Sequence, residues 1–486
     1  MKIKLLDYTF PTEYGKLFES NLVSINEISN DENLIKLITI LSDSTKIEKE
    51  IIFLDFKRFL MTSAEYRRTR LYRWYWNYLT ICVTFLKLAI RMFKKYNLNK
   101  SDIIIDDWSI GVVDDFYEKE FISRAKNLFS CSVLDFGKIF KINLIDGIKC
   151  SKGFITSYFY GLYLSSMYKM NIAYYVCRFF SDYLSGLWIK KNLKPKIVVS
   201  GNDNGLNLIR TKAAGAKVVL IQNGNRPPWS DSCFLYADCY FSMYGEKTNK
   251  IRINMTKCLF KKVYSFGSIR LHNYYKKQAE DKYCYDLLYV STVGNSDQEK
   301  DHDNMLGHYC TLKSEYEAIR LFNDNIAKKN KYKIAYYCRY YGEETELKSM
   351  GLHSDHIEYI SYKPGYVYNF IAKSEIVCST CSTACLEAMS MGKKIVFINL
   401  SGNNYLNYYY KDLEIEYNKN VTIALDEFLE EIKNRKFNYE DYIVQNPKYI
   451  DDVIMCIAQI LDDKNNNFTN RNVTNPAINN LNKFYS

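Results

Sequence analysis

The stretch Glu375–Asn399 reads EIVCSTCSTACLEAMSMGKKIVFIN, and it decides the fold class. A short apolar run ends in a cluster of small hydroxyl residues, and a helical pattern follows that stops at Gly392 before a second apolar run. Short apolar runs that are joined through a helix by short connections are typical of parallel α/β units. The stretch therefore predicts a strand, a loop that can hold a phosphate, a helix and a second strand.

The start of this helix predicts an anion site. Ser379 closes the first apolar run, and Ser382 and Thr383 fall where the helix begins, so that free N–H groups and hydroxyls point into one small space. Helix N-termini of this kind bind phosphates. Glu387 lies about one turn deeper, within reach of a sugar hydroxyl attached to such a phosphate. The alternative is an ordinary N-capped helix, because Ser and Thr are common caps.

Length and charge narrow the class of protein. The chain has 486 residues, which is enough for two domains of roughly 200 residues each. Its 66 basic and 55 acidic residues give a net charge of +11. This charge favours anionic ligands or an anionic membrane surface, and it is too modest to indicate nucleic-acid binding.

Metal ligands are not predicted. The 14 cysteines have no framework spacing, and the group Cys378, Cys381 and Cys385 is accompanied by no second cysteine pair and no histidine pair. We interpret them as free thiols of a reducing cytosol. A D-x-D motif occurs at Asp301–Asp303, but it lies in a charged loop ten residues beyond Ser291. We expect no catalytic metal and no cofactor other than a substrate nucleotide.

One segment raises the question of a membrane. Met1–Asp7 predicts a first strand, and no cleavage site follows it, so we expect no signal peptide. Trp74–Met92 is amphipathic, with Lys87 and Arg91 interrupting its apolar residues, so it is not a spanning helix. It is either a helix packed on the domain core or a peripheral contact with a membrane, since the residues around it are basic.

The order of apolar runs predicts two α/β series. The first has runs at Lys2–Leu6, Ile35–Leu41, Ile103–Ile105, Lys196–Ser200, Lys217–Gln222, Ala237–Phe241 and Tyr264–Phe266. The second has runs at Asp286–Ser291, Lys333–Cys338, Ile357–Ile360, Ile376–Ser379 and Lys394–Asn399. We therefore predict an α/β protein with two Rossmann-like domains facing across a cleft, at 1–266 and 286–462, followed by an Asn-rich tail at 463–486.

The loops after two neighbouring strands of the first series carry polar residues. Asp203, within Gly201–Gly205, follows a strand directly, and Gln222, Asn223 and Arg226 follow the next strand. Open α/β sheets place ligands at this edge, where Asp203 can serve as a general base and the other side chains, with Asn202, can bind an acceptor. Alternatively, Asp203 caps a helix and Gln222–Gly224 is a simple turn. The competing carboxylates also follow apolar runs: Asp106, Asp107 and Asp146.

Taken in order, these motifs resemble a family. The motifs are NDN at Asn202–Asn204, QNG at Gln222–Gly224, YGE at Tyr244–Glu246 and FGSIR at Phe266–Arg270, followed by the Ser/Thr–Glu segment. They are similar to bacterial surface-carbohydrate and capsule glycosyltransferases of the GT-B type, which are akin to Kdo transferases and, distantly, to CDP-glycerol glycerophosphotransferases. Many of those enzymes carry His-Gly where this chain has Asn223-Gly224, so any role of that histidine has moved or the donor differs.

The resemblance implies a glycosyltransferase that uses a nucleotide sugar whose base the sequence does not reveal. It implies donor contacts at Ser382, Thr383 and Glu387, with Ser379, Gly267 and Ser268 nearby. Arg339 and Arg270 can meet the charge of the leaving group. The acceptor is then a surface glycan, either capsular, O-antigenic or lipid-linked, and transfer is expected to be inverting, in the cytoplasm or peripherally at the inner membrane. A nucleotide-sugar epimerase and a non-catalytic glycan-assembly scaffold are the alternatives.

Overall fold

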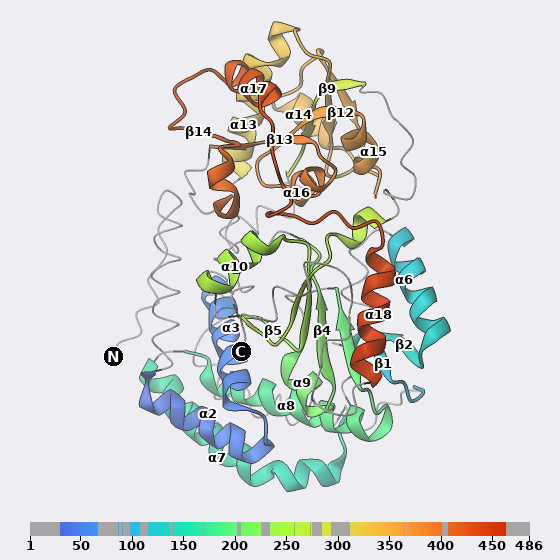
Figure 1. The fold of residues 1–486 in the computed structure, drawn as a ribbon. Helices are drawn as coiled ribbons and strands as arrows, with labels where there is room; N and C mark the ends of the chain where they lie inside the picture. Colours follow the sequence, from blue (N-terminus) through green and yellow to red (C-terminus); the bar gives the residue numbers. More distant parts are fainter. Residues whose placement is uncertain are drawn as a thin grey trace.

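The computed structural model describes residues 30–66, 86, 90, 98–106, 115–136, 139, 141–168, 170–201, 206–224, 234–256, 258–272, 274, 284–292, 312–363, 365–400 and 407–462. Within these residues the chain forms two parallel six-stranded sheets, one in each half of the molecule (Figure 1). The predicted fold class, α/β with two Rossmann-like domains, is confirmed.

The first sheet has the strand order β2-β1-β3-β4-β6-β8. Its strands in chain order are β1 Ile103–Asp106, β2 Cys131–Leu134, β3 Ile197–Ser200, β4 Lys217–Ile221, β6 Cys239–Ser242 and β8 Val263–Ser265. A separate parallel pair is formed by β5 Tyr236–Ala237 and β7 Leu259–Phe260. The described helices of this half are α2 Glu32–Thr45, α3 Lys49–Tyr66, α6 Asp115–Leu128, α7 Leu144–Tyr168, α8 Ile172–Asn192, α9 Leu208–Ala213, α10 Glu246–Met255 and the short 3-10 helix η6 Ile269–Leu271.

The second sheet has the strand order β11-β10-β9-β12-β13-β14. Its strands are β9 Tyr285–Val290, β10 Ile334–Tyr337, β11 Ile357–Ile360, β12 Ser374–Ser379, β13 Lys394–Asn399 and β14 Glu416–Asn418. The helices that follow its strands are α13 Leu312–Asn325, η7 Ala327–Lys329, α14 Glu343–Ser349, α15 Val367–Ala372, α16 Thr383–Ser390, η8 Tyr408–Leu413 and α17 Leu425–Asn434. The strand–loop–helix–strand unit predicted at Glu375–Asn399 is therefore β12, α16 and β13.

The first sheet is covered on both faces, which explains its nearly continuous apolar strands. In β3, Val198 joins the core beneath α2, α3, α7 and α8, while Ile197 and Val199 join a second core on the opposite face. The second core contains α6 and the last described helix, α18 Tyr449–Asp462 (Figure 1). Successive side chains thus enter different cores, as the period of a strand requires.

The position of α18 corrects the predicted extent of the second domain. The prediction assigned 286–462 to that domain, but Ile450, Val453 and Ile457 of α18 pack against the first sheet. An apolar stripe at helical spacing fits either sheet equally well, so the pattern alone could not select between them. In the structure α18 lies beside α6 on the same face of the first sheet.

A second difference concerns Ile35–Leu41, which lies within helix α2. Asp31 caps this helix by accepting hydrogen bonds from the N–H groups of Asn33 and Leu34, both at 3.0 Å. The buried positions are Leu34, Leu37, Ile38 and Leu41, which have helical spacing. The runs at Lys2–Leu6 and, except for residues 86 and 90, Trp74–Met92 lie outside the described residues.

The two halves are joined by backbone contacts where the chain returns to the first sheet. The N–H of Gly245 donates to the carbonyl of Tyr442 at 2.9 Å, and the N–H of Lys247 donates to the carbonyl of Asp441 at 3.0 Å. A Cβ on Gly245 would lie 2.4 Å from the Asp441 carbonyl, so only glycine permits this approach. Across the described parts of the chain, no helix meets the length and apolarity that crossing a membrane requires.

Candidate functional site

The predicted donor site lies at the topological switch point of the second sheet. From the central strand β9 the chain passes to β10 on one side and later returns to β12 on the other. Open parallel sheets bind ligands in the crevice at the carboxyl ends of such a pair of strands. Val290 ends β9 and Ser379 ends β12, and the Ser379 hydroxyl donates to the Val290 carbonyl at 2.6 Å.

The Ser/Thr turn is built from its own hydroxyls. The N–H of Ser382 donates to Ser379 Oγ at 3.3 Å, and the N–H of Ala384 donates to Ser382 Oγ at 3.2 Å. Ser382 is therefore the N-cap of α16, and Thr383 is its first residue. The side chain of Ser382 does what an ordinary cap does, so a phosphate at this turn would have to replace the serine hydroxyls as acceptor of these N–H groups and would rely on neighbouring cations.

Glu387 is a buried carboxylate that accepts hydrogen bonds from both halves of the molecule. It is 1% exposed, it accepts from Ser268 Oγ at 2.6 Å and from the Tyr368 hydroxyl at 2.8 Å, and Arg270 Nη1 lies 3.7 Å from its Oε1. Tyr368 belongs to α15 of the second half, whereas Ser268 and Arg270 follow β8 of the first. The structure thus brings together Glu387, Ser268 and Arg270 from segments that are more than a hundred residues apart.

Gly267 has a conformational reason to be glycine. Its φ is +86°, and a Cβ there would lie 2.6 Å from the carbonyl oxygen of Val444, in the segment that returns to the first sheet. The chain turns at Gly267 so that Ser268 can face Glu387. The predicted contacts at Gly267 and Ser268 therefore lie at the junction of the two halves.

Two buried carboxylates at the same sheet edge were not predicted. Glu315 of α13 is 2% exposed and accepts from the Tyr289 hydroxyl at 3.2 Å and from Thr292 Oγ1 at 2.7 Å; it also accepts from Thr380 Oγ1. It shares the buried stripe of its helix with Ala318, Ile319 and Phe322. In the sequence, the sign of this buried carboxylate was a glutamate at a position of the helix that otherwise carries apolar residues.

Glu343, the second of these buried carboxylates, is hydrogen-bonded to the backbone of Arg339 at the same sheet edge. Glu343 is fully buried and accepts from the Tyr336 hydroxyl at 2.8 Å and from the N–H of Arg339 at 2.5 Å. Burial raises the pKa of the Glu343 carboxyl above its ordinary value, and hydrogen bonds, among them that from Arg339, offset part of this rise. The Arg339 guanidinium donates to the Thr292 carbonyl yet remains exposed at the edge of the sheet. An exposed, anchored cation beside an Ser/Thr turn suits an anionic ligand.

The predicted acceptor side is described only in part. Asn202, Asp203 and Arg226 lie outside the described residues, while Asn223 is half-buried at the end of β4. Gln222 is 2% exposed: its amide Nε2 donates to the Gly224 carbonyl at 2.8 Å, and its Oε1 accepts from Ser242 Oγ at 2.9 Å. Gln222 therefore fixes the turn after β4 to the neighbouring strand β6, and both ends of its amide take part in these contacts.

The competing carboxylates have structural partners. Asp106, at the end of β1, is 3% exposed and accepts from the N–H of Phe136 at 3.1 Å and from Ser200 Oγ at 3.4 Å. Asp146 lies within α7 and pairs with Lys191 at 2.6 Å. Asp107 lies outside the described residues.

The switch point of the first sheet lies between β1 and β3, so the loop that carries Asp203 begins at that crevice.

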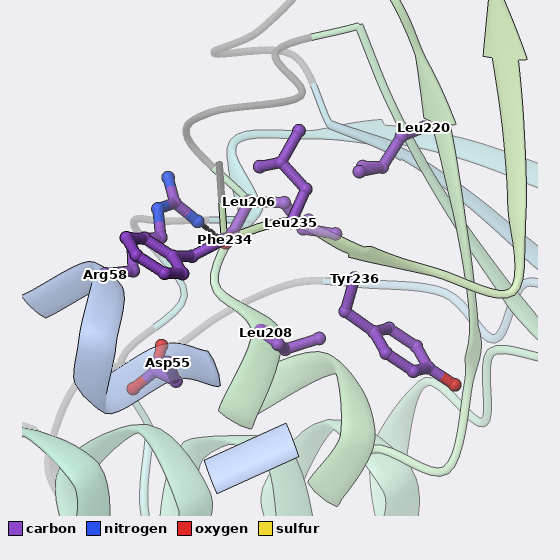
Figure 2. Close-up of a pocket in the computed structure, with 8 residues that line it drawn as sticks. All are labelled: Asp55, Arg58, Leu206, Leu208, Leu220, Phe234, Leu235 and Tyr236. Atoms are coloured by element: carbon purple, nitrogen blue, oxygen red, sulfur yellow. Dashed lines mark hydrogen bonds between the residues drawn. The ribbon is translucent and has the colours of Figure 1, made fainter. Parts of the chain in front are cut away.

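A recess on the first half is lined by residues of α3, α9, β4 and β5 and of the loops that adjoin them (Figure 2). Asp55 and Arg58 of α3 line it together with apolar side chains, and Arg58 Nη1 donates to the Leu206 carbonyl at 3.3 Å. The apolar lining consists of Leu206, Leu208, Leu220, Phe234, Leu235 and Tyr236. The recess has room for little more than one water molecule, so it is too small for a sugar ring.

The thiols near the Ser/Thr turn are held in their protonated form by their surroundings. Burial raises the pKa of both Cys378 and Cys381 to about 12 and that of Cys385 well above its ordinary value. Among the described residues there is no group of three or more His, Cys, Asp or Glu side chains that could hold a metal ion. Asp301–Asp303 lies outside them.

Comparisons with known proteins add little to this geometry. No family model and no curated protein matches the chain. Solved structures that match include a putative UDP-N-acetylglucosamine 2-epimerase from Listeria monocytogenes (10% identity, 76% of this chain and 98% of that one, TM-score 0.41). MurG from Acinetobacter baumannii matches with 11% identity over 74% of this chain and 98% of that one (TM-score 0.37).

The wall teichoic acid polymerase TagF also matches, with 11% identity over 82% of this chain and 98% of that one (TM-score 0.37). At this identity and these TM-scores, the matches carry no argument about the substrate or the site residues of this chain. The two parallel sheets described above are what establish the fold.

Proposed function

We propose that this protein is a glycosyltransferase that moves a sugar from a nucleotide-activated donor to a hydroxyl of a surface glycan, with inversion and without a metal. The observation that carries the proposal is the contact of Glu387 with Ser268 at the switch point of the second sheet. A transferase of this architecture holds its donor between the two halves. Glu387 is a carboxylate that accepts hydrogen bonds from residues of both halves.

The donor phosphates are proposed to bind at the turn formed by Ser379, Ser382 and Thr383. Backbone N–H groups at the start of α16 supply partial positive charge. Arg270, 20% exposed, and the exposed Arg339 supply two further positive charges from different strand ends. As the bond from the sugar to the phosphate breaks, negative charge grows on the nucleotide, and these groups stabilise it where a metal would otherwise be needed.

The ribose is proposed to bind Glu387. Each carboxylate oxygen accepts one hydroxyl in the structure, from Ser268 and from Tyr368, and a carboxylate can accept about four hydrogen bonds in all. Because Glu387 is 1% exposed, a ribose hydroxyl can reach it only when the Ser268 segment moves aside. Donor binding is therefore coupled to a small opening between the two halves.

The acceptor is proposed to be activated by Asp203. In an inverting transfer the acceptor oxygen attacks the anomeric carbon, its proton passes to the carboxylate, and the nucleotide leaves with the electrons of the broken bond. Two of the competing carboxylates, Asp106 and Asp146, are committed to structural contacts, which supports Asp203. Asn202, Asn223 and Arg226 would bind the acceptor glycan, and the proposed setting is the cytoplasmic face of a membrane that carries lipid-linked or capsular glycan.

A nucleotide panel tests the proposal. Melting temperatures are measured with UDP, GDP, CDP and CMP, and one base should stabilise the protein, by about 2.7 kcal/mol at a concentration a hundred times its Kd. The matching nucleotide sugars are then supplied with and without a glycan acceptor. Acceptor-dependent release of the nucleotide supports a transferase, whereas conversion of the sugar without acceptor identifies an epimerase. Stabilisation by none of the nucleotides would leave a scaffold as the better account.

A further inference from the structure

Helix α7 exposes an apolar stripe along its whole length. The exposed large apolar side chains on it are Leu144 (60% exposed), Ile145 (59%), Ile148 (65%), Ile155 (50%), Phe159 (63%), Tyr163 (55%) and Met167 (41%). Their spacing of about four and seven residues keeps them on one side of the helix. No other described helix exposes so many large apolar side chains.

The other exposed positions of α7 are also informative. They are Lys149, Ser151, Lys152 and Thr156, so the exposed side of the helix carries two positive charges and no carboxylate. The single acidic residue of the helix, Asp146, is 5% exposed and is paired with Lys191 of α8. The exposed side of α7 is thus apolar and basic, because the only carboxylate of the helix is buried and paired.

The rest of the fold holds this stripe outward. Phe154, Tyr158 and Leu164 of α7 belong to the core beneath the first sheet, on the opposite side of the helix. At Gly161 a Cβ would lie 3.3 Å from the Cα of Ala173 in α8, so the two helices are in close contact. Figure 1 shows α7, with α2 and α8, at the end of the molecule away from the second sheet. The stripe cannot turn inward without breaking this packing.

We propose that α7 docks the protein on the surface of a lipid bilayer that carries anionic headgroups. A helix of 25 residues is about 37 Å long, and its apolar side would lie in the interface parallel to the membrane plane. The exposed side of α7 has no carboxylate to face Lys149 and Lys152, and anionic headgroups would supply that negative charge. A second copy of the chain would bring two such faces together, with lysines on both sides and no carboxylate from either helix. The inference does not depend on the proposed transfer activity.

The test is flotation of the full chain with vesicles of phosphatidylcholine alone or with added phosphatidylglycerol. The wild type should float with the anionic vesicles. A variant with Ile148→Gln, Ile155→Gln and Phe159→Gln should lose at least about 100-fold in partition coefficient, from the apolar area it no longer buries. Lys149→Gln with Lys152→Gln should lose about 30-fold, and only on anionic vesicles.

A matched control replaces exposed apolar residues elsewhere, with Leu259→Gln, Met350→Gln and Met455→Gln, and should float like the wild type. Melting temperatures should stay unchanged in all variants, because every replaced side chain is exposed. A wild type that floats with neither vesicle overturns the proposal, and so does flotation that survives the triple change in α7. Light scattering that shows a dimer which the same change dissociates would assign the stripe to a second copy and also overturn it.

Discussion

Replacing Glu387 by glutamine separates a ligand-binding role from a structural one. Glutamine keeps the size of the side chain but has only one acceptor oxygen, so one of the two hydroxyls, Ser268 or Tyr368, can still donate to a neutral oxygen, whereas the other faces an NH2 group that cannot accept its hydrogen bond. A bond to a charged group contributes about 1.5–3 kcal/mol and a neutral one about 0.5–1.5 kcal/mol, so the free energy of unfolding should fall by about 2 kcal/mol. If the ribose also binds Glu387, the Kd for the nucleotide should rise roughly 5- to 30-fold, which is about 1–2 kcal/mol.

Chemical denaturation measures the first effect, and calorimetric titration with the stabilising nucleotide measures the second. Glu358→Gln is the matched control, because Glu358 is an exposed carboxylate that accepts from the Tyr285 hydroxyl at 3.0 Å in the same sheet; it should change neither quantity by more than about 0.5 kcal/mol. Ser268→Ala removes the competing hydroxyl and should leave the nucleotide Kd unchanged or lower it. A Glu387→Gln variant with reduced stability and an unchanged Kd would refute the ribose assignment.

Three further predictions concern Asp203, Gly245 and Glu343. Asp203→Asn should lower turnover by roughly 10²–10⁴-fold with the donor Kd unchanged, whereas Asp106→Asn should keep near-normal turnover; steady-state kinetics with the reverse pattern would name Asp106 as the base. Gly245→Ala should destabilise the protein by at least about 1–3 kcal/mol in urea melts, because its Cβ would meet the Asp441 carbonyl at 2.4 Å; a wild-type midpoint would show that the two halves are not held there. Burial raises the pKa of Glu343 in the folded state, so it holds its proton more tightly there than in the unfolded chain, and the stability that it contributes at low pH is lost as pH rises from about 4.5 through the raised pKa. Glu343→Gln should therefore flatten the fall of stability with pH in that window, and an unaltered pH profile would contradict this.

The elements that could be predicted from the sequence are those whose pattern has one physical solution. Runs such as Ile103–Ile105 and Lys394–Asn399 are buried on both faces, so they fit only the interior of a parallel sheet. Ile35–Leu41 fits a strand by composition, yet Asp31 caps it into a helix. The location of α18 depends on which sheet has an uncovered face, and that is a property of the whole fold.

The candidate site divides in the same way. The places of Ser382 at the start of α16 and of Glu387 one turn into it could be predicted, because both lie at fixed offsets from the end of a strand and the start of a helix; their role in donor binding stays a proposal. Glu315 was missed because its partners, Thr292 and Thr380, follow two different strands and meet only in the folded sheet. Gln222 resembles a ligand-binding residue in sequence, and its hydrogen bonds to the next strand become visible only in three dimensions.

Hydrogen–deuterium exchange with and without the stabilising nucleotide tests the central claim most directly. If a nucleotide sugar binds at the edge of the second sheet, backbone amides of 379–387 should become protected, because N–H groups at the start of α16 would donate to the phosphates. The backbone amides of the segment that carries Ser268 should exchange at the same rate or faster, because the ribose displaces the Ser268 hydroxyl from Glu387. Protection of 379–387 is the result that we predict. A nucleotide that binds and stabilises the protein while leaving the exchange of 379–387 unchanged would contradict the proposed donor site.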